Sequence, residues 1–220
     1  MSGARASRVR GIVFDLDGTL VDTMPVVVRG IAHAIAPFVD PPSPAEIYRR
    51  VAGPADRCLA ELLGGDRHVA EAVERLFAYA REHGREIEVY PGAAELLAEL
   101  QAANRPVALW TGRDRTSAMR ILEEANLRGH FDAVVCGDDL PTHKPDPEGF
   151  RHLATALEVP ATELLMVGDA EVDVIGAARA GAQAILIHQE REISAAVRAL
   201  RPDLVDTPAA AFRRIREWLA

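Results

Sequence analysis

Residues 11–20, GIVFDLDGTL, join a short apolar run to a polar turn. The run Gly11–Phe14 is continuous and does not alternate with polar residues, which is typical of a strand buried on both faces of a sheet. Asp15 and Asp17 follow, and Gly18 lets the chain turn sharply while backbone N–H groups stay close to a bound ligand. The segment therefore predicts a buried strand that ends in two carboxylates.

Several later segments share this continuous apolar character, and helical spacing separates them. Residues 115–126, 171–180 and 208–220 each place apolar side chains on one helical face, with Phe212, Ile215 and Leu219 expected to face inward in the last of them. Strands that alternate with helices predict a parallel sheet with right-handed crossovers, which is a doubly wound, Rossmann-like α/β core. The further strand candidates are Val107-Ala108-Leu109-Trp110, Ala133-Val134-Val135, Leu164-Leu165-Met166-Val167 and Ala184-Ile185-Leu186-Ile187.

Residues 22–90 interrupt the alternation and contain no run of the buried-strand type. Four prolines between Pro37 and Pro44 predict a bend there. An apolar stripe at helical spacing follows, which predicts an amphipathic helix. We therefore expect an α/β core formed by residues 1–21 and 91–220, with a helical cap inserted at 22–90. The stripe consists of Val69, Ala72, Val73, Leu76, Phe77 and Ala80.

Chemically reactive residues follow the predicted strands. In an open parallel sheet, ligands bind beyond the carboxyl ends of the strands, so residues just after each strand converge on one edge. Carboxylates, a hydroxyl group, an arginine and a lysine meet there, together with the backbone of a glycine. They are Asp15, Asp17, Thr111, Gly112, Arg113, Lys144, Asp169 and Asp173.

Such a group of carboxylates predicts a cation site. Clustered carboxylates repel one another, and a hard cation with oxygen ligands, such as Mg²⁺, relieves the repulsion and accepts a phosphate oxygen as a further ligand. A lysine and a hydroxyl group beside it suit the remaining phosphate oxygens. A carboxylate can act as the nucleophile, and an acid two residues further on lies on the same side of an extended chain, where it can transfer a proton.

Four motifs in order resemble those of the haloacid dehalogenase superfamily, in the branch of phosphoglycolate phosphatases and β-phosphoglucomutases. They are Asp15-x-Asp17-Gly18-Thr19-Leu20, Thr111, Lys144-Pro145 and Gly168-Asp169-x-x-x-Asp173. The resemblance extends over nearly the whole chain, including the inserted segment and Tyr90-Pro91-Gly92. It implies a magnesium-dependent phosphatase that works through an aspartyl-phosphate.

The resemblance also implies a role for each motif residue. Asp15 would be the nucleophile and Asp17 the acid and base, while Thr111, Gly112 and Lys144 would hold the phosphate. Asp15, Asp169 and the backbone carbonyl of Asp17 would bind the metal. Asp173 would support them, although its charge would also suit the first turn of the helix that follows. Arg113 stands where many relatives have Lys or Ser, and it adds a cation to the edge.

The motifs also narrow the activity. Dehalogenases of the superfamily replace the second aspartate, whereas Asp17 is present here; phosphonate-cleaving members use a lysine in the insertion, and residues 22–90 contain none. The expected substrate is a small phosphomonoester, with phosphoglycolate or a sugar phosphate the best candidate. An inorganic pyrophosphatase and a hexose-phosphate mutase are alternatives. Outside enzymes, the alternatives are a phosphoacceptor signalling module and a silent binding protein.

Other polar residues carry weaker indications. Asp138 and Asp139 form an acidic loop near the same edge, and Arg49, Arg50 and Arg57 flank Gly53-Pro54 in the insertion, where they either face the substrate or lie exposed on helices. Trp110 is expected to pack in the core.

Composition sets the remaining expectations. The 220 residues carry a formal net charge of −8, which argues against nucleic acid or an anionic membrane surface as a partner. No segment has the roughly 20 apolar residues of a membrane span, and no apolar stretch of the signal-peptide type follows residues 1–10. Cys58 and Cys136 form no disulfide framework, so the expected location is the cytoplasm.

Overall fold

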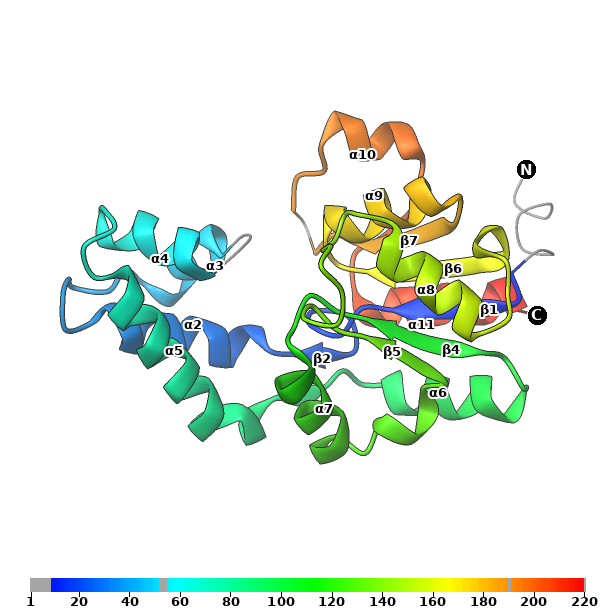
Figure 1. Ribbon diagram of the computed structural model, residues 1–220, viewed down its shortest axis with the longest axis horizontal. Coiled ribbons are helices and arrows are strands. Elements are labelled where there is room, and N and C mark those ends of the chain that lie inside the picture. Colours follow the sequence, from blue (N-terminus) through cyan, green and yellow to red (C-terminus); the bar gives the residue numbers. More distant parts are fainter. Residues whose placement is uncertain (1–8, 52–54, 190, 220) are drawn as a thin grey trace. The chain divides into compact units, whose positions relative to one another are not determined.

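A computed structural model describes residues 9–51, 55–189 and 191–219 (Figure 1). The chain forms two compact units, one comprising Met1–Asp22 and Val89–Ala220 and the other comprising Thr23–Glu88. The first unit is α/β and the second is helical. Two short strands, β2 (Val21–Asp22) and β3 (Glu88–Val89), pair with each other where the chain leaves and re-enters the α/β unit.

The described residues of the α/β unit contain a six-stranded sheet in the order β5-β4-β1-β6-β7-β8. Every pair of neighbours is parallel, and the central strand β1 pairs with both β4 and β6. The strands are β1 (Gly11–Phe14), β4 (Val107–Trp110), β5 (Ala133–Val135), β6 (Leu164–Gly168), β7 (Gln183–Ile187) and β8 (Asp203–Val205). The first five coincide with the predicted apolar runs, and the predicted fold class is confirmed.

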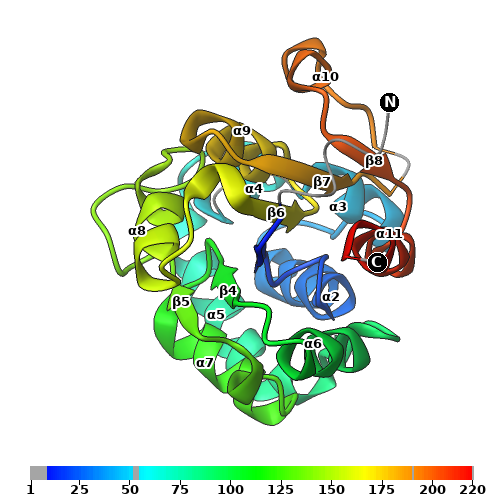
Figure 2. The same cartoon turned by 90° about the vertical axis from the view of Figure 1, so that its right-hand side faces the viewer.

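Helices cover both faces of this sheet, with α8 and α9 on one side and α6 and α11 on the other (Figure 2). Trp110 is buried between α8 and α9, where Gly149 and Gly176 leave room for its ring, so it packs in the core as expected. Phe212 and Ile215 of α11 are also buried. The helices are α6 (Ala93–Ala102), α7 (Arg115–Glu124), α8 (Glu148–Ala156), α9 (Glu171–Ala180), α10 (Ala195–Leu200) and α11 (Pro208–Leu219).

Local signals set the ends of the helices that lead away from the site. Asp114 caps α7 by accepting a hydrogen bond from the backbone N–H of Ser117 at 2.9 Å. Helix α9 ends at Gly181, whose φ of 87° lies in the left-handed region that favours glycine. Helix α7 follows β4 and α9 follows β6, each after a short loop that carries motif residues.

The helical unit contains α2 (Met24–Ile35), α3 (Pro44–Arg50), α4 (Ala55–Leu63) and α5 (Val69–His83). The proline-rich bend between α2 and α3 is present. The predicted apolar stripe of α5 is only partly correct, because Ala72 is buried whereas Phe77 is 50% exposed. A buried core of the unit already comes from Ile35, Ile47 and Leu59, so α5 packs through a narrower face than its periodicity suggests.

Across the described ranges, no helix has the length and apolar character needed to cross a membrane.

Candidate active site

The turn after β1 presents the first two aspartates. The backbone N–H of Gly18 donates to the carbonyl of Val21 at 2.9 Å, which closes the turn. Gly18 has a φ of 71°, and a Cβ atom there would overlap the carboxylate of Asp169. Glycine is thus required both by the backbone conformation and by the close approach of a second carboxylate.

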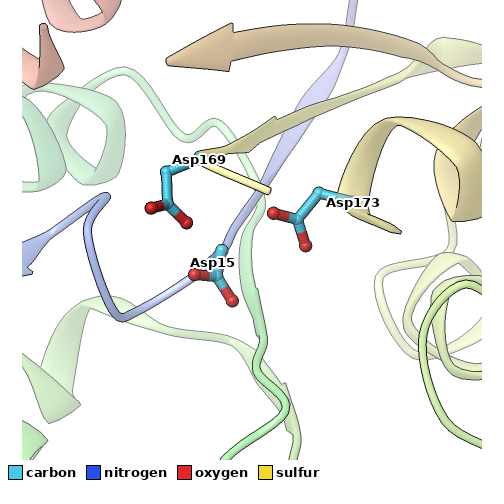
Figure 3. A group of neighbouring side chains, drawn as sticks. All are labelled: Asp15, Asp169 and Asp173. Atoms are coloured by element: carbon cyan, nitrogen blue, oxygen red, sulfur yellow. The ribbon is translucent and has the colours of Figure 1, made fainter. Parts of the chain in front are cut away.

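Three buried or half-buried aspartates gather beside this turn. Asp15 follows β1, Asp169 follows β6 and Asp173 lies in the first turn of α9, and their carboxylates face one another (Figure 3). Each offers an oxygen, and these oxygens all lie within 4.8 Å of one another. Asp15 and Asp173 are 7% and 1% exposed. The sequence motifs of β1 and β6 thus meet in space because these strands are neighbours.

The electrostatics of this acidic cluster favour a bound cation. Burial raises the pKa of Asp15 well above its usual range, and the nearby carboxylates of Asp173 and Asp169 raise it further, whereas Lys144 lowers it. Burial also raises the pKa of Asp169 to about 6, although Arg191 opposes the shift. Ionised carboxylates are therefore disfavoured here unless positive charge is added. The oxygen donors and the charge deficit both fit a hard divalent cation.

Lys144 supplies one positive charge to this cluster. Its Nζ donates to Oδ1 of Asp15 at 2.7 Å and to Oδ1 of Asp173 at 2.6 Å. It also lies 5.0 Å from the centre of the Trp110 ring, which is a cation–π contact. Burial lowers the pKa of Lys144, but the two carboxylates outweigh burial and raise it above its usual value. The ammonium group is thus held charged between the end of β1 and the first turn of α9.

Asp173 has a second partner besides Lys144. Its Oδ2 accepts a hydrogen bond from the backbone N–H of Ala170 at 3.0 Å. Asp173 thus supports the start of α9 and also contacts the lysine, whereas its support of a bound metal stays a prediction.

The end of β4 brings Thr111, Gly112 and Arg113 to the same edge. Thr111 is buried, and its Oγ1 accepts a hydrogen bond from the backbone N–H of Arg113 at 3.1 Å. The guanidinium group of Arg113 donates two hydrogen bonds to Asp17, one from Nε to Oδ2 at 3.1 Å and one from Nη2 to Oδ1. The backbone carbonyl of Gly112 approaches Gly137 so closely that a Cβ atom on Gly137 would overlap it.

The acidic loop after β5 has a structural partner. Arg115 donates from Nε and Nη2 to the two oxygens of Asp139, at 2.6 and 2.5 Å, and its backbone N–H donates to Asp138 at 2.7 Å. The side-chain hydrogen bonding from Arg115 lowers the pKa of Asp139, although burial opposes the shift. The loop therefore anchors the start of α7.

The three arginines of the insertion lie in the helical unit. Arg50 pairs with Glu46 at 2.6 Å, Nε of Arg49 donates to the carbonyl of Ala45 at 3.3 Å, and Arg57 lies in the first turn of α4. Gly53 and Pro54 lie outside the described residues. Contact between these arginines and a substrate stays a prediction.

Two residues at this edge are absent from the sequence prediction. After β7, Arg191 donates from Nη2 to Oδ2 of Asp169 at 2.9 Å and to the backbone carbonyl of Asp169 at 2.6 Å. Gln189 donates from Nε2 to the carbonyl of Gly18 at 3.3 Å. Both follow the carboxyl end of a predicted strand, which is the signal that identifies the other residues, but neither belongs to a motif.

Comparison with known proteins places these residues in a family. The family model described as haloacid dehalogenase-like hydrolase matches residues 12–187. A phosphoglycolate phosphatase of Cupriavidus necator is 33% identical over 186 residues, which cover 80% of this chain and 79% of that protein. A phosphoglycolate phosphatase of Cereibacter sphaeroides is 36% identical over 180 residues, which cover 78% of this chain and 81% of the relative.

A solved structure agrees on the fold. The crystal structure of a β-phosphoglucomutase homologue from Thermotoga maritima superposes with a TM-score of 0.80 at 21% identity, covering 95% of this chain and 99% of the other. At this identity the likeness concerns the fold alone. The family match over residues 12–187 and the two relatives confirm the resemblance inferred from the four motifs. The chain belongs to the haloacid dehalogenase-like hydrolases.

Proposed function

We propose that the protein is a magnesium-dependent phosphatase of small phosphomonoesters, with phosphoglycolate the best single candidate. The observation that carries the proposal is the contact of Lys144 with both Asp15 and Asp173 inside an acidic cluster at the ends of parallel strands. A carboxylate nucleophile, a fixed ammonium group and a cation site then surround the same small space. The similarity to two phosphoglycolate phosphatases supports the choice of substrate.

In the first step of the proposed reaction, an oxygen of Asp15 attacks phosphorus. The bond between phosphorus and the leaving oxygen breaks, and Asp17 donates a proton to that oxygen, so an alcohol departs and an aspartyl-phosphate remains. In the second step, Asp17 accepts a proton from water as the water oxygen attacks phosphorus. The bond to Asp15 then breaks, and inorganic phosphate and the original carboxylate are restored.

Other residues of the site would position the phosphoryl group. The ammonium group of Lys144 and the hydroxyl of Thr111 would bind its non-bridging oxygens, and the turn at Gly112 leaves backbone space beside them. Lys144 is pre-oriented for this task by Asp15, Asp173 and the ring of Trp110. Positioning of this kind removes much of the entropic part of the barrier.

The acidic cluster would hold Mg²⁺ through Asp15, Asp169 and the backbone carbonyl of Asp17, with Asp173 in support. When bound, the metal supplies positive charge that neutralises the phosphoryl oxygens. The raised pKa values of Asp15 and Asp169 support this assignment, because burial, the largest cause of both shifts, disfavours the ionised carboxylates that a bound cation would stabilise.

We propose that residues 22–90 form a cap that restricts the site to small substrates. We also propose that the protein is located in the cytoplasm. Cys58 and Cys136 are both free and buried, in keeping with a reducing compartment.

A panel of phosphate esters tests the proposed function. Purified protein is assayed for phosphate release from phosphoglycolate, glucose 1-phosphate, glucose 6-phosphate, pyrophosphate and a phosphopeptide, with Mg²⁺ and again with excess chelator. We expect repeated turnover of phosphoglycolate that the chelator abolishes and Mg²⁺ restores. A preference for pyrophosphate, transfer of phosphate between positions of glucose, or a single slow equivalent of phosphorylation would instead identify a pyrophosphatase, a mutase or a phosphoacceptor module.

A further inference from the structure

The pairing of Arg113 with Asp17 is the feature of the edge that the proposed reaction leaves unexplained. Two nitrogens of Arg113 bind the two oxygens of Asp17, as a guanidinium group binds any free carboxylate. The backbone of Arg113 is fixed to the end of β4 by its hydrogen bond to Thr111. The guanidinium group therefore extends from a fixed backbone and can bind both oxygens of a carboxylate. In the free protein, that carboxylate is the side chain of Asp17.

The other cations at this edge are engaged elsewhere. Lys144 binds Asp15 and Asp173, and Arg191 binds Asp169, so both face the acidic cluster. Arg115, two residues after Arg113, is paired with Asp139. Arg113 faces the acid and base of the proposed reaction instead, and its side chain is only 22% exposed.

The position of Asp17 fixes what else lies near Arg113. Under the proposed function, on which this inference rests, Asp17 must reach the oxygen that leaves with the alcohol. The guanidinium group contacts both oxygens of Asp17 in the free protein, so it lies within reach of the same short side chain that must also reach the leaving oxygen. A carboxylate carried by the leaving group would present to Arg113 the same geometry that Asp17 presents in the free protein.

We propose that Arg113 recognises a carboxylate on the leaving-group side of the substrate and exchanges Asp17 for it. The exchange orients the substrate and releases the side chain of Asp17 toward the leaving oxygen. The preferred substrates are accordingly phosphate esters of hydroxycarboxylic acids, and not esters of neutral alcohols. Guanidinium suits this role better than ammonium, because its planar fork binds both carboxylate oxygens at once.

Two esters that differ in one group test this proposal. 2-Phosphoglycolate and 2-hydroxyethyl phosphate have the same two-carbon frame, but the first ends in a carboxylate and the second in CH₂OH. Their kcat/KM values are measured for the wild type, Arg113→Met and Arg113→Lys. Arg115→Met is the matched control, because that side chain binds Asp139. Circular dichroism and thermal melting check that each variant is folded.

The wild type should prefer 2-phosphoglycolate by at least about 10-fold. Arg113→Met should reduce this preference by about 10- to 100-fold, the usual value of a charge-assisted pair of hydrogen bonds, chiefly by raising KM for the carboxylate ester. The neutral ester should change by less than about 3-fold. Arg113→Lys should show an intermediate preference, and Arg115→Met should keep that of the wild type.

Other outcomes would overturn the proposal. If Arg113→Met lowers kcat/KM equally for both esters, Arg113 only positions Asp17, since both alcohols require protonation. An unchanged preference, or a wild type that does not distinguish the esters, also excludes recognition by Arg113. If Arg113→Met does not fold, Arg113→Lys tests the proposal instead. A Lys variant with the full wild-type preference for the carboxylate ester would exclude recognition through two guanidinium nitrogens. Failure of the proposed function would look different: the wild type would hydrolyse neither ester nor p-nitrophenyl phosphate.

Discussion

Replacing Asp169 by Asn should stabilise the metal-free protein at pH 8. Burial, opposed in part by Arg191, raises the pKa of Asp169 from 3.8 to about 6 in the folded chain. A group with a raised pKa binds more protons in the folded state than in the unfolded state, so stability falls as the pH rises from about 4 to about 6. At about 1.36 kcal/mol per pKa unit, the ionised carboxylate costs about 3 kcal/mol above this window.

The measurable gain will be smaller than this cost. Asn also gives up the charged contact with Arg191, and the Asp169 side chain is 19% exposed, so we expect an increase of about 1 to 3 kcal/mol in the free energy of unfolding. Urea unfolding is followed by tryptophan fluorescence with excess EDTA at pH 8 and at pH 4. The gain should be present at pH 8 and nearly absent at pH 4, where the wild-type carboxyl group is largely protonated.

Asp203→Asn is the matched control for this measurement. Asp203 pairs with Arg214 at 2.5 Å and is 21% exposed, but it lies outside the acidic cluster. Its replacement should cost between 0 and about 1 kcal/mol. The reasoning is refuted if Asp169→Asn is less stable than the wild type at pH 8 in EDTA, or if its gain is the same at both pH values.

Three further predictions concern single residues of the α/β unit. Asp17→Asn should lower the rate by about 10²- to 10⁴-fold for alkyl phosphates but less for aryl phosphates, whose leaving groups need no proton; equal losses in steady-state kinetics would mean that Asp17 only holds the metal. Gly18→Ala should lower the free energy of unfolding in urea by about 1 to 3 kcal/mol, because φ is 71° and the new Cβ would overlap Asp169. A loss below about 0.5 kcal/mol would contradict this reading. Burial raises the pKa of Cys136 from 9.0 to about 11. Its alkylation by iodoacetamide at pH 8, measured by peptide mass spectrometry, should therefore be about 100-fold slower in the native than in the unfolded protein. A native rate within about 3-fold of the unfolded rate would show that the thiol is accessible.

The fold could be predicted largely from the sequence because its strands are buried on both faces. Four consecutive apolar residues such as Gly11–Phe14 have no exposed side, so the local pattern already reflects the tertiary environment. The strand β8 (Asp203–Val205) was missed for the opposite reason. It lies at the edge of the sheet, where Leu204 is 37% exposed, and its three residues include Asp203, so it lacks the continuous apolar run of the buried strands.

The amphipathic helices were less predictable than the strands. A helical period shows which residues share a face, but not how wide a face the neighbours cover. Phe77 belongs to the apolar stripe of α5 and is nevertheless half-exposed, since the buried contact is made by Ala72.

The motif residues of the site could be predicted because they follow directly from strand ends. The pairings between side chains could not, although Arg113 and Lys144 were themselves expected at this edge. The pairs Arg113–Asp17 and Arg191–Asp169 join side chains 96 and 22 residues apart, and their bonds depend on side-chain reach and on the path of the loop after β7. A sequence pattern thus places reactive groups at one edge, whereas the choice of which charged groups pair with one another becomes visible only in three dimensions.

The central claim is that Asp15 is the nucleophile of a phosphatase. The most direct measurement compares phosphate release from phosphoglycolate by the wild type and by Asp15→Asn, at saturating Mg²⁺ and with both proteins shown to be folded. Asn keeps the shape of the side chain but cannot form the aspartyl-phosphate, so we expect the rate to fall by at least about 10⁴-fold. Activity of the variant within 10-fold of the wild type would contradict the account.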